Sequence, residues 1–167
     1  VCSSDLRVDK EGTGMGWGAV YAQYLESMDQ IGEQGNGLSV SRQLYKGDEA
    51  LNESAPLKVG DKITVRLTVK ADRDMDFVQI KDDRAACMEP LQAVSGFRWS
   101  NGLGYYQATK DASTQFFIDQ MRKGTYVIEY QVYVNRTGEY QTGIATVQSA
   151  YAPEFGGHTG GYRVMVE

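Results

Sequence analysis

KITVRLTVKA, residues 62–71, has the most regular alternation in the chain. Apolar and polar side chains take turns along it: Ile63, Val65, Leu67 and Val69 alternate with Thr64, Arg66, Thr68 and Lys70. A period of two residues is typical of a β-strand with one face in a core and the other in water. A glycine-containing turn at residues 59–61 precedes the run. We therefore predict a half-buried strand over residues 62–71.

Similar strand-like runs recur along the chain. They are LSVSRQLYKG (38–47), DMDFVQIKD (74–82), GTYVIEYQVYV (124–134), GIATVQSAYAPEF (143–155) and GYRVMVE (161–167). In the run at 74–82 the predicted inward residues are Met75, Ile80 and either Phe77 or Val78. Turns containing Gly, Asn or Asp separate the strands, which is typical of antiparallel sandwiches and barrels. The predicted fold class is all-β, an antiparallel β-sandwich.

The first 32 residues follow another pattern. VCSSDL (1–6) lacks the basic start and apolar stretch of a signal peptide and resembles a translated sequencing adapter. We therefore expect residues 1–12 to be non-native or linker residues, and the chain to be a fragment of a longer protein. GMGWGAVYAQYLESM (14–28) predicts a strand. The alternative is a helix over residues 19–28, which the alternating glycines at the start of the run disfavour. GEQGNG (32–37) predicts a linker, and the main domain is expected at 38–167.

Composition excludes several classes of function. The chain has 167 residues, 41% of them hydrophobic, so it suits one domain with a real core. A net charge of −5 disfavours nucleic-acid partners and anionic membranes. Two cysteines and one histidine are too few for a disulfide framework or a zinc site. No apolar run approaches the roughly 20 residues that cross a bilayer. We expect no cofactor, no metal and no enzyme activity.

Three features nevertheless suggest chemistry. Cys87 precedes Glu89 by two residues, but the sequence provides no neighbouring histidine base and no helix start, so a small side chain in a strand is expected. Asp72, Asp74 and Asp76 have the spacing of the first ligands of a calcium loop, but the glycine and the final glutamate of such a loop are missing. A charged turn is expected instead. His158 lies in the glycine-rich FGGHTGGY, where we expect a solvent-facing or backbone-bonded side chain and a bulge or tight crossing.

Aromatic side chains give the candidate interaction surface. Trp99, Tyr105 and Tyr106 fall within FRWSNGLGYYQATKD (97–111). Adjacent tyrosines on a strand point to opposite faces, so one of the two is expected to be exposed. An exposed tyrosine beside a tryptophan can stack on a sugar or dock into a partner. The other interpretation is that these rings only fill the core and cover an edge.

Three long segments resemble one protein family. They are LKVGDKITVRLTVKADRDMDFVQIKDDRAACMEP (57–90), GLGYYQATKDASTQFFI (102–118) and KGTYVIEYQVYVNRTGEYQTGIATVQSAYAPEF (123–155). Together they resemble the C-terminal end of bacterial alpha-2-macroglobulin proteins of the large Bacteroidetes type. GWGAVYAQYLE (16–26) resembles the strand that leaves the preceding CUB-like domain. The resemblance implies that residues 13–37 end that domain and that 38–167 form the final, receptor-binding-like macroglobulin domain.

The resemblance also implies a function. Members of the family are protease traps, endopeptidase inhibitors in which a bait region is cut and a thioester captures the protease. The thioester motif is Cys-Gly-Glu-Gln in a helical domain upstream, and Cys87-Met88-Glu89-Pro90 lacks its glutamine, so Cys87 is not expected to form one. We expect the domain to pack on the thioester domain and shield it, with Trp99, Tyr105 or Tyr106 projecting. The expected partners are therefore the upstream domains of the same chain and, through the whole protein, a target protease.

Two rival functions stay open. One is a carbohydrate- or protein-binding sandwich of a cell-envelope protein that stacks ligands on Trp99 and a neighbouring tyrosine. The other is a structural spacer without a ligand. The resemblance implies a periplasmic or envelope location, with any lipid anchor in a missing N-terminal segment.

Overall fold

A computed structural model describes residues 7–18, 24–52, 55–161 and 163–167. Within this part of the chain the structure is all-β, apart from one 3-10 turn, η1 (Met28–Gln30). The strands are β1 (Gln34–Asn36), β2 (Leu38–Lys46), β3 (Glu49–Ala50), β4 (Lys62–Ala71), β5 (Met75–Asp83), β6 (Met88–Pro90), β7 (Gly96–Ser100), β8 (Leu103–Thr109), β9 (Ser113–Met121), β10 (Gly124–Val134), β11 (Gly138–Gln141), β12 (Ala145–Ser149), β13 (Gly156–His158) and β14 (Arg163–Val166).

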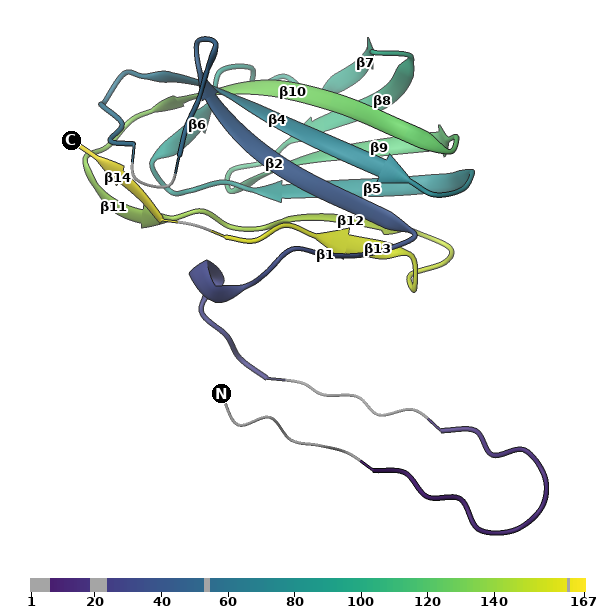
Figure 1. The fold of residues 1–167 in the computed structure, drawn as a ribbon. Coiled ribbons are helices and arrows are strands. Elements are labelled where there is room, and N and C mark those ends of the chain that lie inside the picture. Colours follow the sequence, from purple (N-terminus) through teal and green to yellow (C-terminus); the bar gives the residue numbers. More distant parts are fainter. Residues whose placement is uncertain (1–6, 19–23, 53–54, 162) are drawn as a thin grey trace.

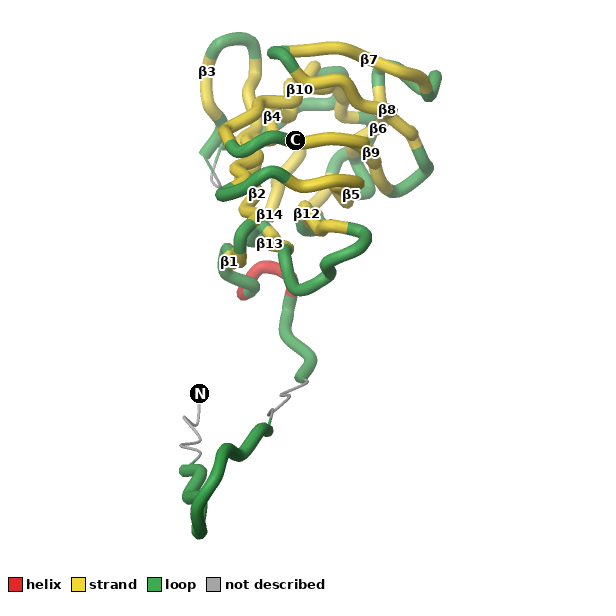
Figure 2. The backbone as a smooth tube through the Cα atoms, turned by 90° about the vertical axis from the view of Figure 1, so that its right-hand side faces the viewer, coloured by secondary structure: helices red, strands yellow, loops and turns green. Residues whose placement is uncertain are grey.

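The strands form a two-layer sandwich (Figures 1 and 2). One layer has the order β6-β10-β4-β2, and β3 pairs with β2. The other has the order β12-β5-β9-β8-β7. Short strands β1 and β13 join β2 to β12, so the layers are continuous along one edge. A separate ribbon of β11 and β14 lies beside them, and the strand ladders are antiparallel. The predicted all-β antiparallel sandwich is confirmed.

Alternation decides which side chains form the core. On β4 the predicted apolar face is fully buried, and the matching face of β10 is buried from Ile128 to Val134. The two strands pair along their whole length, from Gly124 opposite Ala71 to Tyr133 opposite Lys62. In the predicted strand at 161–167, β14, Val164 and Val166 are buried on one side, while Tyr162 lies outside the described residues.

Strand β5 breaks the alternation at one residue. Met75, Val78 and Ile80 point into the core, whereas Phe77 is exposed. Phe77 has φ +53°, the left-handed region, which rotates its side chain out of the inward series. Its ring meets Tyr151 edge-on, with 5.1 Å between the centroids. Of the two residues that the sequence left open, Phe77 and Val78, the inward one is therefore Val78.

The N-terminal predictions were less successful. The strand predicted over 14–28 falls partly on residues 19–23, which are outside the described residues, and the described positions 14–18 and 24–27 form no strand. These positions have no neighbouring strand to pair with, and a lone strand gains no ladder hydrogen bonds. The predicted linker 32–37 is wrong in its second half, because β1 pairs with both β13 and β2 there.

Glycines permit the close approach that joins the two layers. Gly35 of β1 pairs with Gly157 of β13. A Cβ atom on Gly157 would lie 2.7 Å from the carbonyl oxygens of both Gln34 and Leu38, closer than any real contact. The glycine-rich segment before the last strand therefore makes the tight crossing expected from the sequence.

This crossing predicts a contrast between two glycines. Gly157→Ala forces a methyl group into backbone atoms, and we expect it to lower the free energy of unfolding by at least ~2 kcal/mol. Gly96→Ala is the control, because a Cβ there meets nothing within 4 Å and φ is not positive. The control should change stability by less than about 1 kcal/mol. Urea denaturation measures both, and equal losses would contradict the close-approach argument.

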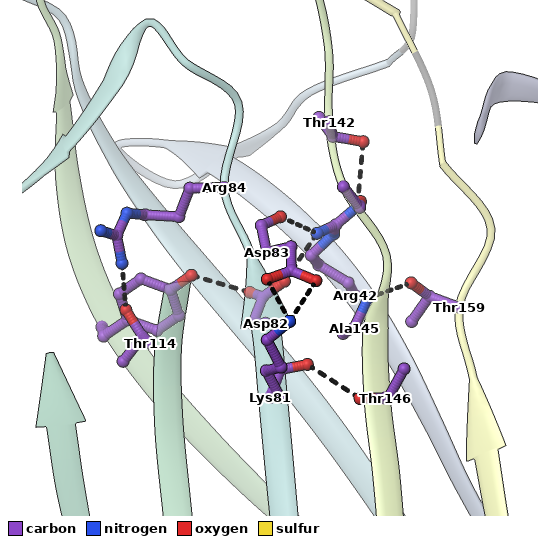
Figure 3. A network of polar contacts seen from close by, with 12 residues as sticks. Arg42, Lys81, Asp82, Asp83, Arg84, Thr114, Thr142, Ala145, Thr146 and Thr159 are labelled. Atoms are coloured by element: carbon purple, nitrogen blue, oxygen red, sulfur yellow. Dashed lines mark hydrogen bonds and ion pairs between the residues drawn. The ribbon is translucent and has the colours of Figure 1, made fainter. Parts of the chain in front are cut away.

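A buried ion pair crosses the sandwich between β2 and β5 (Figure 3). Arg42 Nη1 lies 2.6 Å from Asp82 Oδ1, and the two side chains are only 4% and 1% exposed. The second carboxylate oxygen of Asp82 accepts a 2.7 Å hydrogen bond from the Tyr130 hydroxyl on β10. Arg42 also donates to the carbonyl oxygens of Asp83 and Gly143 and to Thr142 Oγ1. The pair thus connects both layers and the segment that precedes β12.

The sequence contains a signal for this pair, although we did not predict it. Arg42 shares the inward parity of Leu38, Val40 and Leu44 on β2. Asp82 has the parity of Val78 and Ile80 on β5. Opposite charges at core positions of two strands are costly unless they meet, since each isolated charge would lose its hydration.

The Tyr130 hydroxyl gives a prediction at high pH. Burial and the neighbouring Asp82 carboxylate raise the pKa of Tyr130 well above its usual value of 10. The unfolded chain therefore releases this proton first, and the contribution of Tyr130 is intact below pH 10 and is lost as pH rises further. We expect the unfolding free energy to fall above pH 10 less steeply in Tyr130→Phe than in the native sequence. Urea denaturation at several pH values measures both proteins. Equal slopes of unfolding free energy against pH above pH 10 would contradict this role of Tyr130.

Candidate interaction surface

The β7–β8 hairpin positions the predicted aromatic residues. Its turn is Asn101-Gly102, with φ +51° and +77°, as required by the type I′ turn that suits a two-residue hairpin. This turn places Trp99 opposite Gly104 and Phe97 opposite Tyr106. Asn101 Nδ2 also donates to the carbonyl oxygen of Val127 on β10, at 3.1 Å. The hairpin tip is thereby attached to the other layer.

Trp99 is the most prominent of the three predicted residues. It is 78% exposed, and its ring lies so close to Gly104 that a Cβ there would be 2.8 Å from ring carbons. Glycine at position 104 is therefore what allows the indole to lie against the strand. Phe97 is 81% exposed and its ring meets Tyr106 edge-on, with 5.1 Å between centroids. Phe117 on β9, opposite Tyr106, is exposed as well.

Tyr105 is the exception and corrects our prediction. It is only 4% exposed, and its ring packs against Phe116 in the core with centroids 5.7 Å apart. Burial raises the pKa of its hydroxyl, and the nearby Arg98 opposes that shift. The two tyrosines do point to opposite faces, but Tyr106 is half-buried because Phe97 covers it. The surface is therefore made by Phe97, Trp99, Tyr106 and Phe117, and we call it the aromatic surface.

Two of these residues were not predicted from the sequence. Phe97 shares the parity of Trp99 on β7, and Phe117 is adjacent to the inward Phe116. The Asn-Gly dipeptide at 101–102 would have predicted the hairpin and its register, and with it the exposed side of Phe97. To predict that Phe117 belongs to this surface, the pairing of β8 with β9 must be known, and no local sequence signal gives that pairing.

A pocket of about 650 Å³ adjoins the aromatic surface. It is lined by Phe97, Arg98, Trp99, Gly102, Leu103, Gly104, Tyr105, Phe117, Asp119, Gln120, Arg122 and Tyr126. These residues come from β7, β8, β9 and the start of β10, together with the hairpin turn and the β9–β10 connection. It combines aromatic walls with two guanidinium groups, which is suited to a peptide-like ligand.

Cys87 has no features of a nucleophile. It is fully buried in the turn before β6, and its carbonyl oxygen accepts a 2.9 Å hydrogen bond from the amide of Asn135. Burial raises the pKa of its thiol, which disfavours the reactive thiolate. The expected role as a small core side chain agrees with this placement.

Cys87 should accordingly resist thiol reagents. In a Cys2→Ser variant, where Cys87 is the remaining thiol, we expect labelling by a disulfide reagent at pH 8 to be at least about 100-fold slower than in urea. Reaction would then be limited by opening of the fold. Rapid labelling of the folded protein would show that Cys87 is accessible.

The other two sequence features have structural partners. His158 lies in β13, where its Nδ1 is 3.2 Å from the carbonyl oxygen of Thr159, so it is backbone-bonded. Asp72 pairs with Arg73 at 2.9 Å, and Asp74 accepts a hydrogen bond from the amide of Lys123. Among the described residues no group of three or more His, Cys, Asp or Glu side chains is arranged to hold a metal ion. In the same part of the chain no helix is long and apolar enough to cross a membrane.

Comparison with known proteins decides the family. Residues 37–154 match the family model of the bacterial alpha-2-macroglobulin MG10 domain. The chain belongs to this family. The matched residues run from the start of β2 past the end of β12, so they include both layers of the sandwich and the aromatic surface.

Individual relatives are much longer than this MG10 domain chain. An alpha-2-macroglobulin homolog of a Nostoc species is 26% identical over 98% of the chain, which covers 9% of that protein. The circularly permutated Ras protein 2 of Dictyostelium discoideum is 28% identical over 98% of the chain and 4% of its own length. Elastase-activated Escherichia coli alpha-2-macroglobulin superposes with a TM-score of 0.70 at 16% identity, covering 82% of the chain and 14% of that structure. This likeness supports the macroglobulin-like fold.

Proposed function

We propose that this alpha-2-macroglobulin domain is the non-catalytic C-terminal domain of a bacterial protease trap, and that its aromatic surface packs on and shields an upstream thioester domain. The observation that carries the proposal is the exposure of Trp99 and Phe97 at 78% and 81%. Large rings grouped on one face of a sheet indicate an interaction site, because such a patch is unfavourable in water.

The size of the relatives supports a partner within the same polypeptide. The chain spans less than a tenth of the length of the curated relatives it matches. A domain inside a long chain is held close to its neighbours, so a modest aromatic contact suffices for stable packing. Three residues of the aromatic surface, Phe97, Trp99 and Tyr106, also lie on a hairpin whose outer strand, β7, is the last strand of its layer among the described residues.

The proposed role is mechanical. A thioester is lost to water and amines, so a contact that excludes solvent prolongs its lifetime. An indole ring fixed against Gly104 provides such a cover, because the ring is large and loses little conformational freedom on packing. When a protease cuts the bait region, the domain would move as one body and uncover the thioester. The chain itself contributes no chemistry in this proposal, since Cys87 is buried and His158 is bonded to backbone.

The proposal also includes the type of bacterium that the protein comes from and its location in the cell. The resemblance to Bacteroidetes proteins supports a periplasmic or envelope location, where such a trap meets foreign proteases. The target protease and the upstream CUB-like and thioester domains are the partners it implies.

A carbohydrate-binding function is the second candidate. The exposed ring of Trp99, flat against a strand and next to Phe97, is the kind of platform on which sugars stack. Glycan titration of the chain, followed by tryptophan fluorescence, separates the two functions. Saturable binding that Trp99→Ala removes would favour the lectin function over the shield.

The shield is tested in the full-length protein of an intact gene copy. We expect Trp99→Ala to speed methylamine-induced thiol release about tenfold, a barrier change of ~1.4 kcal/mol. Tyr151→Ala is the matched control, because Tyr151 has the same 78% exposure but lies at the β12–β13 connection, outside the aromatic surface. Equal rates for both variants, or an upstream sequence without a Cys-Gly-Glu-Gln motif, would refute the shield.

A further inference from the structure

Strands β8 and β9 are paired over only part of their length. The ladder runs from Thr109 opposite Thr114 to Tyr106 opposite Phe117 and stops there. Leu103–Tyr105 continue β8 and Ile118–Met121 continue β9, yet these segments have no register with one another. Their other edges are paired, with β7 and β5 respectively. These two segments therefore have no ladder between them, and we call the gap, which is accessible at Gly104, Asp119 and Gln120, the notch.

The hairpin attachment explains why the notch stays open. The Asn101 side chain binds the carbonyl oxygen of Val127, which belongs to β10 of the opposite layer. The start of β8 is therefore drawn toward that layer, while β9 continues beside β5 (Figure 1). The pocket of about 650 Å³ fills this divergence, since its lining includes Leu103–Tyr105 from one edge and Asp119 and Gln120 from the other.

The notch also has a positive charge that its own surroundings do not neutralise. Neither Arg98 nor Arg122 has a carboxylate within ion-pair distance among the described residues, although both line the pocket. Arg98 Nε is buried and has no hydrogen-bond partner in that part of the chain, and its Nη2 makes only a 3.4 Å contact with the carbonyl oxygen of Val94. Asp119 is the one acidic residue of the lining. This is unusual in a chain with a net charge of −5.

These two properties identify the chemistry of a ligand. Unpaired strand edges bind a main chain in extended conformation, as in strand addition. A guanidinium with a free donor binds a carboxylate, preferably with two parallel hydrogen bonds. The facing segments are three and four residues long, so the notch suits a short extended segment with an acidic side chain.

We propose that the notch binds an extended, carboxylate-bearing peptide segment contributed by another domain of the same polypeptide, which adds as a strand between β8 and β9. The source of the segment rests on the proposed function, whereas strand addition and charge recognition rest on the notch alone. The notch borders the aromatic surface, because Trp99 and Phe117 line both, so one neighbouring domain can occupy the two together. Tethering makes a weak site sufficient.

A peptide titration tests the recognition chemistry. The chain carries Trp17→Phe, so that Trp99 is the single fluorescent indole, and is titrated with Ac-Val-Thr-Glu-Val-Thr-NH2 and with the same peptide containing Gln in place of Glu. We expect saturation with a Kd of about 1 mM for the acidic peptide and at least about fivefold weaker binding of the Gln peptide. Equal affinities, or no saturation by either peptide, would overturn the proposal.

Arginine variants place the binding at the notch. Arg98→Gln and Arg122→Gln should each reduce the affinity for the acidic peptide to that for the Gln peptide. Arg122 is exposed, so its variant keeps the test valid even if Arg98→Gln destabilises the fold. Arg73→Gln is the control, because Arg73 is also exposed but pairs with Asp72 away from the notch. Loss of affinity in the control as well would contradict a site at the notch.

Hydrogen exchange tests the source of the segment. In the full-length protein those amides of Leu103–Tyr105 and Ile118–Met121 that point away from β7 and β5 should exchange more slowly than in the isolated chain, and Arg122→Gln should restore fast exchange. Equal exchange in both proteins would refute a segment from the same polypeptide. Thiol release distinguishes this result from failure of the shield. If the notch amides are protected but Trp99→Ala leaves the rate of thiol release unchanged, the notch is supported and the shield is refuted. If the notch amides are not protected but Trp99→Ala speeds thiol release, the shield is supported and the notch is refuted.

Discussion

The ion pair of Arg42 and Asp82 is the contact on which the sandwich most depends. It lies between the two layers, it is almost completely shielded from water, and Tyr130 binds its second carboxylate oxygen. Removing one partner of such a pair typically costs about 3–5 kcal/mol, because the other charge stays buried without compensation. The same guanidinium that reaches the Asp82 carboxylate also donates to the carbonyl oxygen of Gly143, so these contacts depend on where β2 lies relative to β5. We infer that the pair helps to select how the layers face each other, in addition to the apolar packing between them.

This constraint acts unevenly across the fold. At the β1–β13 edge the layers are continuous, and the glycines at 35 and 157 bring the backbones close. At the other end of the second layer, β8 contributes Leu103 and Tyr105 to the common core, and Asn101 at the hairpin tip donates a hydrogen bond to β10 of the first layer. The ladder with β9 ends early there, and the exposed aromatic residues gather at the same place. The incomplete ladder between β8 and β9 and the exposed aromatic residues therefore occur in the same part of the sandwich.

Local sequence patterns predicted the features that a single strand determines, such as its bounds. They missed the features that require two strands to pair or pack, such as β1 and the exposure of the tyrosines. The strand at 62–71 has the predicted bounds because its alternation is complete. Phe77 was ambiguous because a left-handed residue shifts the inward series, and the sequence does not mark such a residue when it is not glycine. β1 was predicted as linker because three residues, QGN, carry no alternation and become a strand only through β13. Tyr105 and Tyr106 were placed on opposite faces correctly, but their exposure depends on Phe116 and Phe97.

The mechanical role proposed for the domain follows from this division. A domain that moves as a rigid body needs two layers that keep their relative position during the movement. The ion pair of Arg42 and Asp82 stabilises that relative position. It also needs contacts that can be released without disturbing the interior. Trp99 and Phe97 are such contacts, since they project from a hairpin whose loss of a partner leaves the ladders of β4 with β10 and β2 intact. Strength inside the sandwich and weak attachment at its end are therefore compatible in one domain, because different residues are responsible for each.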